Sequence, residues 1–223
     1  MRPPVSPPAS RLSPHFVSRL CRLLARLLLR VSVSGAEHVP PTGPLLITIN
    51  HLGGADPFLC LAYLPRPLTI AGKREIFGWP VLGRVARAYG MIPLARGEPD
   101  RATLRLLLDR LTSGAALLIA PEGRESLTGA LEQGKGGPAF LAQHADCAVL
   151  PVALTGTAWR VVLPAWKRLR RPPVTVTIGA PYRLPPGQPR RAAADDIMRR
   201  LAALLPPAYR GVYASESPPD VVR

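Results

Sequence analysis

The sequence predicts an α/β domain in which a mostly parallel β-sheet is flanked by helices. Short apolar runs typical of buried strands recur at residues 45–49, 68–71, 91–94, 115–119, 148–154 and 174–178. Stretches with helical spacing of apolar residues alternate with them, at residues 57–63, 80–88, 101–111, 136–144 and 193–205. This alternation is typical of strand–helix–strand units with a parallel sheet. A chain of 223 residues has room for one such domain with a full hydrophobic core.

The two ends of the chain differ from this central region. Residues 1–14 contain five prolines and no periodic pattern, so we expect them to be disordered. Residues 15–32 are expected to form an amphipathic helix, and residues 33–205 the α/β domain. The proline-rich segment 206–223 is expected to be a flexible tail.

The N-terminal helix is too short and too charged to span a bilayer. Sixteen residues from Phe16 to Val31 reach about 24 Å, whereas the hydrocarbon core is about 30 Å thick. Inserting its four arginines costs roughly 10 to 14 kcal/mol, whereas inserting the apolar residues contributes only about 4 kcal/mol of favourable free energy. A helix lying in the membrane interface fits better, and an amphipathic helix packed on the domain's own core is the alternative. Arginines interrupt the apolar region, which argues against a signal peptide.

The composition points to anionic partners. The formal net charge is +15, from 26 Arg and 3 Lys against 14 acidic residues. Lipid head groups, an acidic carrier protein or phosphorylated substrates would be attracted. Nucleic acid is excluded as a partner, because no helix-turn-helix, zinc-finger or aromatic RNA-binding signature is present. The three cysteines lack metal-ligand spacing and suggest a reducing compartment.

Polar side chains capable of acid–base chemistry or anion binding follow three separate predicted strands. His51 and Asp56 come after the first strand, Arg96 after a weaker one, and Glu122 after the strand ending near residue 119. The carboxyl ends of parallel strands meet at one edge of a sheet, where ligands bind. If these strands are neighbours, a base, two carboxylates and a cation share one crevice.

Within that crevice, His51 and Asp56 suit proton transfer. Histidine is the side chain best matched to general-base chemistry at neutral pH, and a carboxylate can orient it. The alternative is a structural turn in which Asp56 caps a helix that has Pro57 in its first turn. No Gly-x-Ser-x-Gly nucleophile elbow is present. A substrate hydroxyl or water is therefore the expected proton donor.

Four sequence blocks in order resemble the glycerolipid acyltransferase family, which includes bacterial 1-acylglycerol-3-phosphate acyltransferases. They are His51-x-x-x-x-Asp56, Gly90-x-Ile92 with Arg96, Pro121-Glu122-Gly123, and Leu150-Pro151-Val152. The resemblance covers roughly residues 33 to 180, so that residues 33–205 become the expected acyltransferase domain.

The resemblance implies a reaction and a role for each residue. His51 would deprotonate an acceptor hydroxyl for direct attack on an acyl thioester, either acyl-CoA or acyl-carrier protein, and Asp56 would orient it. Arg96 would bind the phosphate of a lysophospholipid, for which 1-acylglycerol-3-phosphate is the expected identity. Glu122 and Gly123 would help to form the acceptor site. No metal or resident cofactor is implied.

One block departs from the family pattern. The family usually reads Pro-Glu-Gly-Thr-Arg-Ser, whereas this chain reads Pro121-Glu122-Gly123-Arg124-Glu125-Ser126. Arg124 could supply the displaced cation, or Glu125 could indicate a less anionic acceptor. Lys135 matches a family lysine position, and a solvated surface lysine is the alternative.

A second basic cluster, at residues 166–171, follows an apolar stretch that contains Trp159. Tryptophan beside arginine is typical of a membrane-interface anchor, and a solvated loop is the alternative. We therefore expect an enzyme held peripherally on the cytoplasmic face of the cell membrane by anionic lipids. A non-catalytic, peripheral lipid-binding protein of the same fold is the competing hypothesis.

Overall fold

The computed structural model describes residues 12–94 and 101–215 of the chain. It contains a seven-stranded sheet in the order β1-β7-β6-β2-β5-β3-β4. The strands are β1 Arg30–Ser34, β2 Leu45–Ile49, β3 Leu68–Lys73, β4 Ile92–Leu94, β5 Ala116–Ile119, β6 Ala148–Thr155 and β7 Pro173–Ile178. The five strands from β6 to β4 are parallel, which confirms the predicted α/β architecture. Strand β7 is antiparallel to β6, and β1 is parallel to β7.

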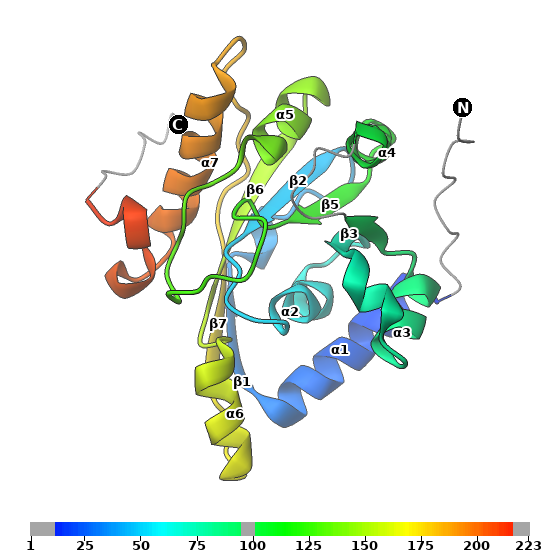
Figure 1. Ribbon diagram of the computed structural model, residues 1–223, viewed down its shortest axis with the longest axis vertical. Coiled ribbons are helices and arrows are strands. Elements are labelled where there is room, and N and C mark those ends of the chain that lie inside the picture. The colour runs from blue at the N-terminus through cyan, green and yellow to red at the C-terminus, as the bar shows by residue number, and fades with distance from the viewer. Residues whose placement is uncertain (1–11, 95–100, 216–223) are drawn as a thin grey trace.

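Helices cover both faces of this sheet (Figure 1). They are α1 Pro14–Leu28, α2 Asp56–Tyr63, α3 Leu82–Tyr89, α4 Arg101–Thr112, α5 Gly136–His144, α6 Trp159–Lys167 and α7 Arg190–Ala203. Short 3-10 helices occupy Ala36–His38, Arg74–Gly78, Pro207–Tyr209 and Gly211–Tyr213.

The central strand β2 divides the core into two halves. Its side chains alternate between the faces of the sheet, as in any strand. Leu45 and Ile47 pack with Leu59 of α2 and with the buried side of α1. Leu46 packs on the opposite face with buried residues of α4, α5 and α7. Because all five residues of β2 are buried, this strand gives the following turn a rigid starting point.

The expected N-terminal helix is shorter than the sequence suggested. Helix α1 ends at Leu28, and residues 30–34 form strand β1 rather than the last turn of a helix. Backbone pairing with β7 overrides the amphipathic pattern there. One side of α1 packs against α2, with Val17 and Ala25 buried. None of the described helices is long and apolar enough to cross a membrane.

Two further segments differ from expectation. Residues 159–167, which the sequence marked only as an apolar stretch, form helix α6 although it contains Pro164. The tail expected to be flexible from residue 206 forms two 3-10 helices as far as Tyr213, whose side chain is buried against α7 and β6 residues. The remainder of the tail, from residue 216, and the N-terminal residues 1–11 lie outside the described chain.

Candidate active site

The candidate site begins where β2 ends. Asn50 is buried, and its side-chain amide donates to the carbonyl of Leu154 at 2.8 Å and accepts from the Leu154 N–H at 2.7 Å. These two bonds clamp the end of β2 to β6, its neighbour in the sheet. The next residue is His51, so the clamp fixes the main chain from which the candidate base projects.

The His51 side chain is bonded to the carboxylate of Asp56. Its Nδ1 lies 2.9 Å from Oδ2 of Asp56, and the imidazole is 16% exposed whereas the carboxylate is fully buried. The same Oδ2 accepts the N–H groups of Leu52 at 2.7 Å and Gly53 at 2.9 Å. A carboxylate bonded in this way holds the proton of the neutral imidazole on Nδ1. The lone pair of Nε2 is then left available as a base.

The loop between the two residues must be compact for this bond to form. A Cβ on Gly53 would lie 2.6 Å from the carbonyl oxygen of Thr157, and one on Gly54 would lie 3.0 Å from the Trp159 ring. Glycine is therefore required at Gly53, where main chain approaches main chain. Trp159, the first residue of α6, packs directly against the His51–Asp56 turn.

Glu122 joins this turn to the loop that follows β5. Its Oε1 accepts the backbone N–H of His51 at 3.1 Å, and Oε2 accepts that of Glu132 at 2.9 Å. Burial raises the pKa of Glu122 above its ordinary value, although the two N–H donors act in the opposite direction. Because both oxygens are occupied by backbone donors, Glu122 holds two loops together instead of offering a free carboxylate to a ligand.

Arg124 lies in this loop and is held by another acidic side chain. Its Nε and Nη2 donate to Oε2 of Glu132 at 3.1 and 2.6 Å. The N–H of Leu127 donates to the other Glu132 oxygen at 2.9 Å, and these donors lower the pKa of Glu132. The charge of Arg124 is therefore already balanced within the chain.

Glu125, the residue that departs from the family pattern, faces a lysine. Its Oε1 lies 3.9 Å from Nζ of Lys73 at the end of β3, and both side chains are about one-third exposed. A carboxylate at this position partly cancels a cation that a phosphate would otherwise attract.

The positive charge of Lys135, unlike those of Arg124 and Lys73, is not paired with a carboxylate of the described chain. Gly123 has a φ of +75°, and a Cβ there would lie 2.9 Å from Nζ of Lys135, so the amine sits over the Gly123 turn. Lys135 is the residue before α5, and its own N–H donates to the Pro121 carbonyl. No acidic residue of the described chain forms an ion pair with this amine.

Strands β2 and β5 are direct neighbours, with Thr48 opposite Ile119. The structure therefore brings together six of the seven residues that the sequence singled out, namely His51, Asp56, Glu122, Gly123, Arg124 and Lys135. The seventh, Arg96, lies outside the described residues.

Sequence reasoning missed three residues that support the site. They are Asn50, Glu132 and Ser126, whose backbone N–H donates to the carbonyl of His51 at 2.7 Å. For Asn50, the sequence signal was a polar residue directly after a predicted buried strand. No sequence pattern indicated the loop contacts of Glu132 and Ser126.

Comparison with known proteins identifies the family to which the chain belongs. The model of the family described as "Acyltransferase" matches residues 30–155, more than half of the chain. The chain belongs to the glycerolipid acyltransferase family. The matched residues include the His51–Asp56 turn, Glu122 and Lys135.

Several acyltransferases of known name are similar to this chain. A lyso-ornithine lipid O-acyltransferase of Pseudomonas aeruginosa is 35% identical over 68% of this chain and 56% of that protein. A chloroplastic 1-acyl-sn-glycerol-3-phosphate acyltransferase of Arabidopsis thaliana is 28% identical over 64% of this chain and 41% of that protein. The chain thus spans about half the length of the curated relatives that it matches.

The fold also matches that of a solved acyltransferase. The crystal structure of the 1-acyl-sn-glycerophosphate acyltransferase of Thermotoga maritima superposes with a TM-score of 0.68 at 20% identity. The superposition covers 86% of this chain and 79% of that one.

The arrangement of side chains at this site is suited to proton transfer. The His51 imidazole stands at a strand end, and its Nδ1 is bonded to a buried carboxylate. Among the residues that the structure describes, no group of three or more His, Cys, Asp or Glu side chains could hold a metal ion.

Proposed function

We propose that this acyltransferase moves a fatty acyl group from an acyl thioester to a hydroxyl of a lysophospholipid, with His51 as general base. The observation that carries the proposal is the 2.9 Å bond between His51 Nδ1 and the buried Asp56 carboxylate. That bond leaves Nε2 as the atom that can accept a proton.

In the proposed reaction, one proton moves from the acceptor hydroxyl to His51 and then to the departing thiolate. His51 Nε2 takes the proton of the acceptor hydroxyl as its oxygen attacks the thioester carbonyl carbon. The tetrahedral intermediate then collapses, the carbon–sulfur bond breaks, and an ester forms. The departing thiolate takes the proton from the imidazolium, which Asp56 has stabilised meanwhile. A thioester is already activated, so the proposed reaction requires neither a metal ion nor a resident cofactor.

The proposed acceptor is 1-acylglycerol-3-phosphate, which would give phosphatidic acid. Two observations support this choice. The relative from Arabidopsis thaliana carries this acceptor in its name. In addition, the Lys135 amine lies over the Gly123 turn beside Glu122, where it can bind a phosphate. Arg96 remains a predicted second phosphate ligand.

The proposed donor is acyl-CoA or acyl-carrier protein. Both are acidic thioesters, and a chain with a formal charge of +15 attracts them in the same way. Assays with each donor at matched acyl chain would separate the two.

The catalytic proposal is tested by thiol release from an acyl thioester in the presence of 1-acylglycerol-3-phosphate. His51→Ala should lower kcat by about 10² to 10⁴-fold, the usual contribution of a general base. Its circular dichroism spectrum and vesicle binding should match those of the wild type. Retention of more than about a hundredth of the rate would contradict the base assignment. Absence of turnover in the wild type would favour the lipid-binding hypothesis.

A second acceptor class is favoured by Glu125. Its carboxylate faces Lys73, and Arg124 is already paired with Glu132, so two of the cations near the site are partly neutralised. A lysolipid whose head group carries an amine would suit such a site better than a phosphate monoester. The Pseudomonas aeruginosa relative is named for an acceptor of this kind, lyso-ornithine lipid.

The two acceptor classes are separated by kinetics with both lipids. If the amine-bearing acceptor is the natural one, wild-type kcat/KM should be higher with lyso-ornithine lipid, and Glu125→Arg should shift the preference toward 1-acylglycerol-3-phosphate. Glu125→Gln, which removes the charge without reversing it, is the matched control. A preference that Glu125→Arg leaves unchanged would show that this side chain does not select the acceptor.

We also propose that α1 holds the enzyme peripherally on the cytoplasmic face of the cell membrane. One side of the helix exposes a continuous apolar stripe, formed by Phe16, Leu20, Leu23, Leu24 and Leu27. Leu23→Gln together with Leu27→Gln should reduce sedimentation with anionic vesicles. Arg19→Gln, on the neighbouring basic side of the helix, should do so only at low salt. Sedimentation of the double-leucine variant at the wild-type level would contradict the role of the stripe.

A further inference from the structure

The connection between α6 and β7 projects at one end of the molecule. Helix α6 and the return segment 168–172 lie at the lower end of the view in Figure 1, near the carboxyl end of α1. Several of their apolar side chains are exposed, among them Leu163 at 46% and Leu169 at 97%, whereas Val162 is buried. We call α6 and residues 168–172 the α6–β7 tip.

Leu169 occupies a backbone position that usually belongs to glycine. Its φ is +54°, in the left-handed region, where a side chain with a Cβ is disfavoured. The turn is closed by bonds from Leu169 N–H to the Trp166 carbonyl and from Arg170 N–H to the Ala165 carbonyl, both 2.9 Å. This pair of bonds is the Schellman arrangement that ends many helices.

Two other described helices end with the same pair of bonds, and both use glycine. Gly90 ends α3 with a φ of +81°, and Gly114 follows α4 with a φ of +90°, each with the same two-bond closure. Helix α5 ends with the longer of the two bonds, from Cys147 N–H to the Ala142 carbonyl, and has Asp146 in the left-handed position. A leucine at the equivalent position costs backbone energy and, being almost fully exposed, gains no packing within the chain. The backbone cost of Leu169 is therefore not offset by packing within the described chain.

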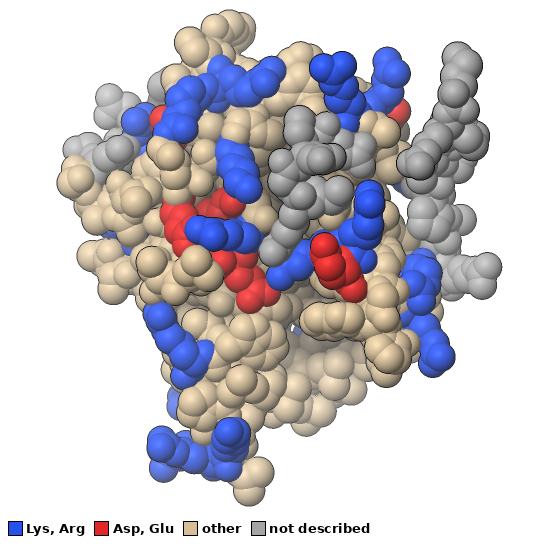
Figure 2. Space-filling view, viewed as in Figure 1, with Lys and Arg blue, Asp and Glu red and all other residues tan. Residues whose placement is uncertain are grey.

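The charge around Leu169 indicates which kind of surface its side chain would contact. Lys167, Arg168 and Arg170 surround it, and all three are exposed. No acidic residue occurs between positions 147 and 194 of the sequence. Figure 2 shows basic side chains gathered over this end of the molecule, with no acidic ones among them. A single apolar side chain ringed by cations matches an anionic bilayer, with phosphates above and acyl chains below.

The tip is fixed to α1 by three hydrogen bonds. Trp166 Nε1 donates to the carbonyl of Leu28 at 3.0 Å, and Arg171 donates to the carbonyl of Leu29 from Nε at 3.1 Å and from Nη2 at 2.8 Å. These bonds join the tip to the helix that carries the exposed leucine stripe. The α6–β7 tip and the leucine stripe of α1 are therefore held in a fixed position relative to each other.

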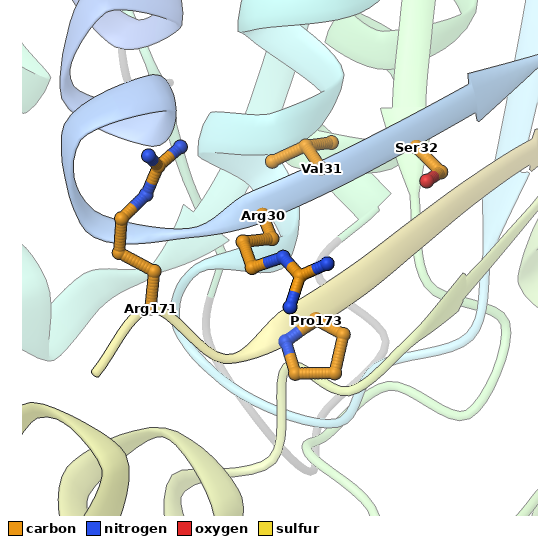
Figure 3. Close-up of a pocket in the computed structure, with 5 residues that line it drawn as sticks. All are labelled: Arg30, Val31, Ser32, Arg171 and Pro173. Atoms are coloured by element: carbon orange, nitrogen blue, oxygen red, sulfur yellow. The ribbon is translucent and has the colours of Figure 1, made fainter.

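A basic depression lies where these segments meet. It has a volume of about 430 Å³ and is lined by Arg30, Val31, Ser32, Arg171 and Pro173 (Figure 3). Figure 3 shows the Arg30 guanidinium beside Pro173, while that of Arg171 points toward the end of α1. The Arg30 guanidinium and the Ser32 hydroxyl, with no carboxylate in the lining, are donors suited to a phosphate, and Arg171 adds positive charge although it is bonded to the Leu29 carbonyl.

We propose that the α6–β7 tip is a second membrane contact, which binds anionic bilayers separately from α1. Leu169 and Leu163 enter the interface, Lys167, Arg168 and Arg170 meet lipid phosphates, and the Arg30–Arg171 depression holds one head-group phosphate. Because Trp159 at the start of α6 packs on Gly54, this contact would fix the orientation of the His51 turn relative to the membrane.

The test uses the full-length protein and sedimentation with vesicles of phosphatidylglycerol and phosphatidylcholine, or of phosphatidylcholine alone. Leu169→Gly removes the apolar side chain at a position that glycine prefers, so the melting temperature should stay the same or rise. The partition coefficient on anionic vesicles should nevertheless fall about three- to tenfold, as expected for losing part of a buried leucine. Val212→Ala, at another exposed apolar residue outside α1 and α6, is the control and should bind like the wild type.

The charge of the tip is tested separately. Arg168→Gln with Arg170→Gln, and Arg30→Gln alone, should each weaken binding to anionic vesicles and leave the weak binding to phosphatidylcholine unchanged. Wild-type binding by Leu169→Gly, or equal binding of the wild type to both vesicle types, would overturn the proposal. The assay contains no acyl donor and is repeated with His51→Ala, so its outcome does not depend on the proposed acyl transfer.

Discussion

The backbone N–H of His51 donates to Oε1 of Glu122 at 3.1 Å, so the candidate base is positioned through its main chain by a carboxylate from the neighbouring strand end. The other oxygen of Glu122 holds the N–H of Glu132 in the loop that carries Arg124. One buried carboxylate therefore sets the distance between the turn that carries His51 and the proposed acceptor loop.

Glu122→Gln should impair catalysis without removing any proposed catalytic group. The amide has one acceptor oxygen for two N–H donors, so either His51 or Glu132 loses its partner and the turn shifts. A displacement on the order of 1 Å can cost as much as about 10²-fold in rate. We expect kcat to fall toward that limit. A kcat equal to that of the wild type would show that the bridge does not position His51.

The same variant should change how stability depends on pH. Burial raises the pKa of Glu122 in the folded protein above its ordinary value of 4.5. Between the unfolded and folded pKa values, the folded protein binds more protons than the unfolded chain. The stabilising contribution of Glu122 is therefore fully present below the unfolded pKa and is lost as the pH rises through the folded one.

Urea unfolding at several pH values between about 4 and 7 measures this contribution. The free energy of unfolding of the wild type, minus that of Glu122→Gln, should increase as the pH falls. Taking the difference cancels the other titrating groups. A difference that is constant over this range, or that decreases toward acid, would show that burial does not raise the pKa of this carboxyl.

Asp56→Asn should separate orientation of the base from folding. The amide oxygen can still accept the N–H groups of Leu52 and Gly53, which now bind Oδ2. The amide nitrogen then takes the place of Oδ1, and the neutral oxygen still accepts from Nδ1 of His51 but no longer stabilises the imidazolium that forms during proton transfer. We expect kcat to fall by about 10³ to 10⁴-fold with little change in the circular dichroism spectrum.

A double variant checks that Asp56 acts through His51. His51→Ala with Asp56→Asn should be no slower than His51→Ala alone, because residues that work as one unit are not additive. If the rate loss of the double variant equalled the product of the two single losses, Asp56 would have a role separate from that of His51.

The parts of the fold that the sequence could predict are those that local patterns determine. The buried runs at residues 45–49 and 116–119 are strands, the helix at Gly136–His144 has the expected bounds, and parallel neighbours bring His51 and Glu122 together. Strand β1 was hidden, because its residues continue the helical pattern of α1 and it becomes a strand only by pairing with β7.

Long-range loop contacts explain what could not be predicted at the site. The Arg124–Glu132 pair depends on how residues 121–135 fold back, and no periodicity describes that segment. The sequence suggested that Arg124 could replace a displaced cation, whereas the structure shows it balanced by an acidic side chain eight residues along the chain. Local patterns locate strand ends, and tertiary contacts decide which charges remain available there.

Asn50 and Thr48 offer a pair of tests within one strand end, with opposite expected signs. Asn50→Leu has a similar size but removes both bonds to the buried backbone of Leu154, so the free energy of unfolding should fall by about 2 to 4 kcal/mol. Thr48→Val, two residues earlier, removes a buried hydroxyl that has no hydrogen-bond partner, so stability should stay the same or increase.

Urea unfolding of the two variants measures these changes, and thiol release measures their effect on the site. Asn50→Leu should also lower kcat, because the clamp on Leu154 fixes the main chain from which His51 projects. Thr48→Val should keep the wild-type rate, since its hydroxyl holds no part of the turn. If both variants lost stability equally, packing volume at the end of β2 would explain the effect, and the hydrogen bonds of Asn50 would not be what fixes His51.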